Sequence, residues 1–79
     1  LTANAALSTM FMFELATPQR IRLAIYDIIG RRVALVDEGF RNSGTHRVYF
    51  DASQLASGTY FYRLDTNSGV RVNRLQIIR

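Results

Sequence analysis

The sequence predicts an all-β sandwich of about seven short strands, and three observations lead to this prediction. Apolar and polar residues alternate over short runs, as at Ile21, Leu23 and Ile25, which is the period of a half-buried strand. Glycines interrupt these runs where turns need their backbone freedom. No stretch has a convincing helical period. Short strands separated by frequent turns are typical of a sandwich or a barrel.

Composition limits both the size of the core and the kinds of site. The chain has 79 residues, enough for one domain that buries about 60% of its unfolded surface. It has no cysteine, which excludes disulfides and thiolate metal sites. All ten basic residues are arginine and the net charge is +4, but they are scattered, so no nucleic-acid arm is predicted. No apolar segment approaches the roughly 18 residues of a membrane span, and no signal peptide is expected within these residues.

The chain opens with a lead-in or linker remnant at residues 1–8, followed by one domain at 9–79. Residues 9–15 alternate, with Met10 and Met12 on one face and Phe11, Phe13 and Leu15 on the other. A helix is the alternative, because methionine and leucine favour helices. The alternation of phenylalanines and the turn signal at 16–18 favour a strand, which is apolar on both faces.

Turn chemistry divides the rest of the chain. Asp27 is expected to accept backbone hydrogen bonds in a tight turn that Gly30 allows. In a regular strand Val70 and Val72 would point to the opposite face from Leu75 and Ile77, so a bulge is predicted near residues 73–74. The predicted strands are 20–27, 32–36, a short edge strand at 40–41, 45–50, 60–64 and 70–78, with turns at 27–31, 37–39, 42–44 and 66–69.

Residues 51–64 organise the fold. They begin with a polar turn in which Leu55, the one large apolar residue, is expected to point into the core. Gly58 and an aromatic strand that begins at Tyr60 follow. This order predicts a tyrosine corner, in which the Tyr60 hydroxyl bonds back to the backbone of the connection. The corner favours an immunoglobulin-like Greek-key sandwich.

Candidate catalytic and binding residues do not form a convincing site. His46, Asp51 and Ser53 are the residue types of a triad, but His46 and Asp51 alternate to opposite faces of one strand. Aromatics and Arg63 at 60–63 alternate across two faces, unlike an RNA-binding sheet. Several acidic residues lack the dense spacing of a calcium loop and are placed in turns as backbone acceptors: Asp27, Asp37, Glu38, Asp51 and Asp65. No catalytic residue, cofactor, metal or nucleic-acid partner is predicted.

Two motifs in order resemble a known family. Ile21 to Val33 reads Ile-x-Leu-x-Ile-Tyr-Asp-x-x-Gly-Arg-x-Val, and Ser43 to Leu64 includes Phe-Asp-Ala-Ser-x-Leu-Ala-Ser-Gly-Thr-Tyr-Phe-Tyr-Arg-Leu. With the basic-flanked last strand at 74–79, they resemble the C-terminal sorting domain of the type IX secretion system. The related immunoglobulin-like domain of flagellar hook-capping proteins is similar as well.

The resemblance implies a non-catalytic address on a larger exported protein. Such a domain follows an N-terminal cargo domain, is recognised in the periplasm by secretion machinery at the outer membrane, and is often cleaved. It sends its cargo to the cell surface or the medium. The residues that the resemblance assigns to the signal are Gly58, Tyr60, Arg74, Leu75, Ile77, Ile78 and Arg79.

The start of the chain departs from the family. Asn4 to Leu7 stand where a proline-rich stretch is usual, and Met10 and Met12 replace polar outward residues. We therefore expect the outer face of the first strand to meet another surface, either the cargo or a second copy through an edge strand. The alternative function is a structural or adhesive module, or a filament subunit, associating through strand edges.

Overall fold

The computed structural model describes residues 8–78, and within them the chain forms six β-strands. The predicted all-β class is confirmed, with six strands where about seven were expected. None of the described residues forms a helix, so none forms one that could cross a membrane. The strands are β1 (Thr9–Leu15), β2 (Gln19–Tyr26), β3 (Arg32–Arg41), β4 (Gly44–Phe50), β5 (Gly58–Thr66) and β6 (Gly69–Ile77).

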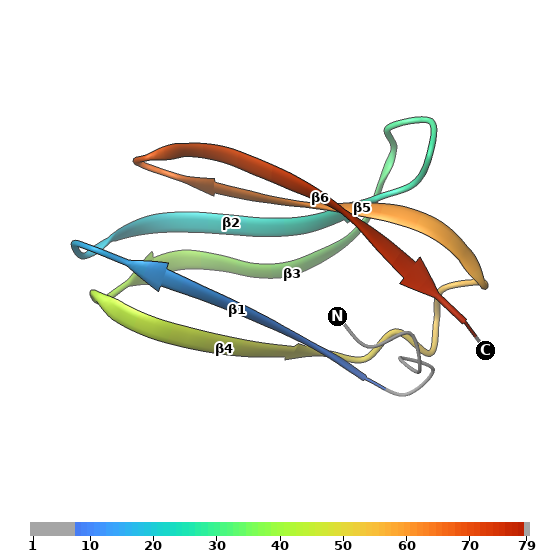
Figure 1. The fold of residues 1–79 in the computed structure, drawn as a ribbon, viewed down its shortest axis with the longest axis horizontal. Coiled ribbons are helices and arrows are strands. Elements are labelled where there is room, and N and C mark those ends of the chain that lie inside the picture. Colours follow the sequence, from blue (N-terminus) through green and yellow to red (C-terminus); the bar gives the residue numbers. More distant parts are fainter. Residues whose placement is uncertain (1–7, 79) are drawn as a thin grey trace.

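The strands form two antiparallel sheets that make a sandwich. β1 pairs with β4, and the other four strands form a sheet in the order β3-β2-β5-β6. In Figure 1, β1 and β4 lie together along one side of the molecule, while β5 and β6 lie along the opposite side. The β1–β4 and β2–β5 pairs join strands that are distant in sequence, as expected for an immunoglobulin-like sandwich.

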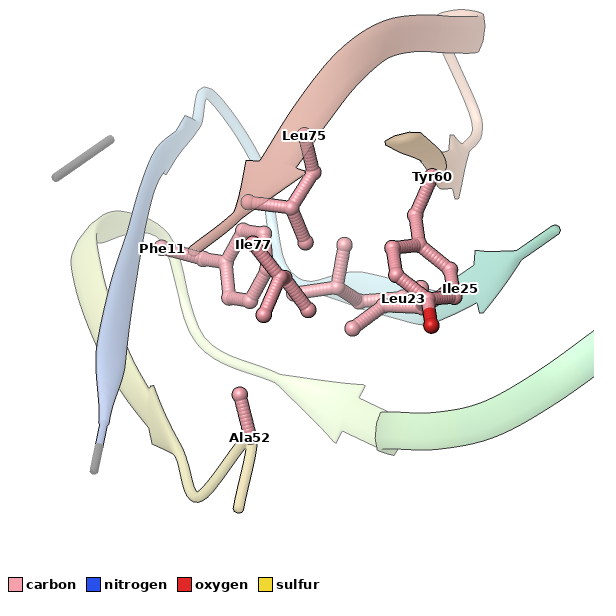
Figure 2. Packing of buried hydrophobic residues seen from close by; sticks show 7 residues of the cluster. All are labelled: Phe11, Leu23, Ile25, Ala52, Tyr60, Leu75 and Ile77. Atoms are coloured by element: carbon pink, nitrogen blue, oxygen red, sulfur yellow. The ribbon is translucent and has the colours of Figure 1, made fainter. Parts of the chain in front are cut away.

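The core lies between the two sheets (Figure 2). The ring of Phe11 from β1 meets that of Tyr62 from β5 edge-on, with 4.9 Å between the ring centroids. Aromatic pairs favour this geometry, and this one joins the two sheets directly. Figure 2 shows the buried side chains that converge here: Phe11, Leu23, Ile25, Ala52, Tyr60, Leu75 and Ile77.

The predicted turn after β2 is confirmed. The Asp27 carboxylate accepts the backbone N–H of Ile29 at 3.1 Å and that of Arg31 at 2.9 Å. Its other oxygen accepts the Nε–H of Arg31 at 2.8 Å. Gly30 has a φ of 89°, a conformation that other residues rarely adopt. The Asp27 side chain, Gly30 and two backbone hydrogen bonds between Asp27, Gly30 and Arg31 together fix the turn.

The turn predicted at residues 37–39 is wrong, because β3 runs unbroken from Arg32 to Arg41. The acidic residues that predicted a turn find partners from within the strand. Glu38 lies opposite Arg22 of β2 and accepts its Nε–H at 2.9 Å, while Asp37 pairs with Arg41. A register shift opposite Leu23 and Ala24 accommodates the extra residue.

The bulge predicted near residues 73–74 is also wrong. β5 and β6 keep one register from Gly58 opposite Ile77 to Thr66 opposite Gly69. The change in parity arises because Val70 and Val72 point outward, where they are 54% and 55% exposed. Arg71 and Asn73 lie on the same face as Leu75 and Ile77 but are exposed, so β6 contributes to the core only through its last residues.

Gln19 joins two turns at one end of the sandwich. Its buried side chain donates from Nε2 to the Thr17 carbonyl oxygen at 3.1 Å. Its Oε1 accepts the backbone N–H of Asn67, in the β5–β6 turn, at 2.6 Å. A buried amide that is satisfied on both sides orients these turns, since leaving either group unpaired is costly.

Candidate recognition surface

The structure brings almost all the predicted signal residues together in one piece of the β5–β6 hairpin. Residues 58–61 of β5 pair with residues 74–77 of β6, and we call this piece the terminal ladder. Gly58 lies opposite Ile77, and Tyr60 lies opposite Leu75. Ile78 follows directly, whereas Arg79 lies outside the described residues. Residues separated by about fifteen positions in the chain thus form one surface element.

The tyrosine corner holds the start of the terminal ladder. The Tyr60 hydroxyl donates to the Ala56 carbonyl oxygen at 2.7 Å, as predicted. The Asp51 carboxylate accepts the N–H of Ser53 at 2.9 Å, and half-buried Leu55 packs against the core. Gly58 has a φ of 151°, which a side chain would resist. The connection into β5 is therefore fixed by short-range hydrogen bonds and one packed leucine.

The inner face of the terminal ladder is part of the core. Leu75 and Ile77 are each 1% exposed, and Tyr60 is 9% exposed. No partner can contact Leu75 or Ile77 while the domain is folded, and Tyr60 reaches the surface only at the edge of a hollow. Their contribution to a signal must therefore be indirect, through the shape and stability of the hairpin.

The outer face and the end of the terminal ladder are accessible. Arg74 is exposed opposite Phe61, and Ile78 is 52% exposed. Thr59 donates its hydroxyl to Oε1 of Gln76 at 3.0 Å, which holds the two strands together on this face. A cation within β6 and a large apolar side chain directly after it are thus presented four residues apart.

Some arginines of the described residues form ion pairs and others do not. Ion pairs join Arg22 to Glu38, Arg31 to Asp27, Arg41 to Asp37 and Arg63 to Asp65. The pKa of Asp27 is lowered, chiefly because its carboxylate accepts the backbone N–H of Arg31. Within residues 8–78, the arginines that form no ion pair are Arg20, Arg32, Arg47, Arg71 and Arg74. The excess positive charge therefore includes the exposed cation of the terminal ladder.

A shallow hollow lies beside the terminal ladder, and the two sequence motifs meet in it. Its volume is about 450 Å³. Ile28 and Ile29 from the β2–β3 turn line one part, and Ser57, Gly58 and Thr59 line another. Both isoleucines are 70% exposed. Motifs separated along the chain thus share one end of the molecule, which their order in the sequence does not show.

The residue types of a catalytic triad have other roles. His46 is hydrogen-bonded through Nε2 to the Asn42 carbonyl oxygen at 2.7 Å and stacks on Phe13, with ring centroids 5.4 Å apart. Among the described residues, no group of three or more His, Cys, Asp or Glu side chains could hold a metal ion. The placement of Asp37, Glu38 and Asp65 in turns is corrected, because all three lie in strands and pair with arginines.

Met10 and Met12 point away from the core, as predicted, and are 39% and 59% exposed. They lie on the other sheet from the terminal ladder. The structure therefore separates the two predicted groups of residues into distinct surfaces.

A comparison with family models finds a match to the secretion system C-terminal sorting domain over residues 7–78. The match covers nearly the whole chain and both motifs. Comparisons with curated proteins and with solved structures find no match.

Proposed function

This chain belongs to the family of secretion system C-terminal sorting domains, and on that premise we propose that it directs a larger exported protein across the outer membrane. The cargo precedes the domain in the same polypeptide and reaches the cell surface or the medium by way of the periplasm. The domain acts as an address and carries out no reaction.

We propose that the secretion machinery contacts the accessible part of the terminal ladder. The observation that supports this is the division of the predicted signal residues between two environments. Arg74 and Ile78 are exposed, while Leu75 and Ile77 are each 1% exposed. An unpaired guanidinium suits a carboxylate on the machinery, because it can bind both oxygens. Leu75 and Ile77 keep the strand in place for that contact.

A reporter fusion tests the function. A reporter with an ordinary signal peptide is fused ahead of residues 1–79 and expressed in a bacterium with this secretion system. We expect the reporter outside the cell, and we expect the same reporter without the domain in the periplasm. A folded fusion that stays in the periplasm to the same extent as the control would contradict the proposal.

A further inference from the structure

The outer face of the β1–β4 sheet, which we call the entry face, forms a surface distinct from the terminal ladder. The polypeptide enters the fold at β1, which is one of the two strands of this face. Met12 is 59% exposed, Met10 39% and Tyr49 70%. The side chains of the entry face are Met10, Met12 and Glu14 from β1 and Thr45, Arg47 and Tyr49 from β4.

Polarity changes steadily along the entry face. Met10 lies opposite Tyr49 at the end where the chain enters, and Met12 lies opposite Arg47 in the middle. At the far end, Thr45 donates its hydroxyl to the Glu14 carboxylate at 3.3 Å. The apolar pair is therefore nearest to the incoming chain, and the polar pair is satisfied within the face. Contiguous exposed apolar side chains mark contact sites.

Arg47 adds a requirement on charge. It forms no ion pair with any residue in the range 8–78. Beside two exposed apolar side chains, a carboxylate from a partner would bind it in surroundings with less water, where ion pairs are stronger. The matching surface thus has an apolar spot opposite Met10 and Tyr49 and an acidic group opposite Arg47.

Area favours a tethered occupant over a free one. Two strands of seven residues make a face of about 24 Å by about 10 Å, given the usual strand rise and spacing. This flat outline is small compared with the roughly 800 Å² of accessible surface that each partner of a stable free interface buries. A surface in the same polypeptide meets the entry face in an intramolecular event, so a contact smaller than a free interface suffices.

We propose that the entry face docks onto the domain that precedes this one in the parent polypeptide. The inference rests on the proposed function, because a C-terminal sorting domain follows a cargo. Docking fixes the orientation of the sorting domain relative to its cargo and leaves the terminal ladder, on the other sheet, free for the secretion machinery.

Hydroxyl-radical labelling tests the docking, because sulfur atoms and aromatic rings are oxidised readily when exposed. The parent polypeptide is compared with residues 1–79 alone, which contain the complete core described above. Oxidation of Met10, Met12 and Tyr49 should fall severalfold in the parent. Phe40, which is 58% exposed on the four-stranded sheet, is the internal control and should not change.

Charge reversal in the parent polypeptide identifies the contact. Arg47→Glu should raise oxidation of Met10 and Met12 to the level in the isolated domain. Arg71→Glu is the matched control, because Arg71 is also exposed and unpaired within the described residues but lies on β6. It should leave methionine oxidation unchanged.

Equal oxidation of the two methionines in the parent and in the isolated domain would overturn the proposal. Protection that appears in the isolated domain as its concentration rises, with a dimer in sedimentation, would also overturn it and assign the face to a second copy. Neither result affects the sorting function, because the reporter fusion measures export independently. Failure of export with protected methionines would instead reject the sorting role alone.

Discussion

Single side chains fix the turns of this sandwich. Tyr60 and Asp27 each close a connection by hydrogen bonds to backbone groups at most four residues away in the sequence. Because these bonds are local, both could be predicted from the sequence. Gln19 could not be, since its partner Asn67 is 48 residues away and no local pattern indicates it.

Removing the Tyr60 hydroxyl should cost stability. Tyr60→Phe leaves the Ala56 carbonyl oxygen without its partner, so the free energy of unfolding should fall by about 1 kcal/mol or more. Urea denaturation measures the change. Tyr62→Phe is the control, because the Tyr62 hydroxyl has no hydrogen bond to a described residue. An equal, negligible effect of both substitutions would show that the corner does not support the fold.

Asp27 should make stability depend on pH in acid. Its pKa is lowered in the folded state, chiefly by the Arg31 backbone N–H, so its stabilising effect is present above its ordinary pKa of 3.8. That effect is lost as the pH falls through the folded-state pKa. Asp27→Asn keeps an acceptor oxygen but not the charge, so the variant should be less stable at neutral pH.

Urea denaturation across the acidic range, compared between the wild type and Asp27→Asn, checks this prediction. The difference in unfolding free energy should shrink as the pH falls below about 4. A difference that stays constant across this range would mean that the ionised carboxylate contributes nothing to the turn.

Individual strands show where sequence patterns succeed and where they fail. The alternation of Phe11, Phe13 and Leu15 predicts β1 with its observed bounds. The acidic residues of β3 led to the prediction of a turn, because a local pattern does not show their partners. Arg22, for example, is sixteen positions from Glu38. On β6, the apolar residues shift from even to odd positions along the strand. The sequence does not show whether a bulge or an exposed first half of the strand causes this shift.

The two faces of β6 should respond differently to substitution. Leu75→Ala opens a cavity in the core, so the free energy of unfolding should fall by about 2–5 kcal/mol. Arg74→Gln changes an exposed side chain without an ion-pair partner in the described chain, so stability should stay within about 0.5 kcal/mol. Chemical denaturation of the two variants measures both values. A large loss from Arg74→Gln would mean that Arg74 belongs to the fold rather than to an accessible signal.

At the scale of the whole molecule, the sandwich separates its surfaces. The terminal ladder lies on the four-stranded sheet and the entry face on the two-stranded sheet. The fold class and the family could be predicted, because turn residues and the order of the motifs can be recognised directly along the sequence. The convergence of both motifs on one hollow could not, since it depends on the pairing of β2 with β5.

This arrangement limits the use of truncations. Deleting residues 74–79 removes the exposed Arg74 and Ile78 together with Leu75 and Ile77 of the core. Loss of export would then follow from unfolding as readily as from loss of the signal. Point substitutions on the exposed face separate the two causes.

The most direct measurement is therefore the amount of reporter outside the cell for two matched double variants of the fusion. Arg74→Gln with Ile78→Ser changes the exposed cation and apolar side chain of the terminal ladder and its end. Arg71→Gln with Val72→Ser makes the same kinds of change earlier on β6, where both residues are also exposed. With both domains folded by circular dichroism, the first variant should stay in the periplasm and the second should be exported like the wild type. Equal export of the two would contradict a signal carried by the accessible part of the terminal ladder.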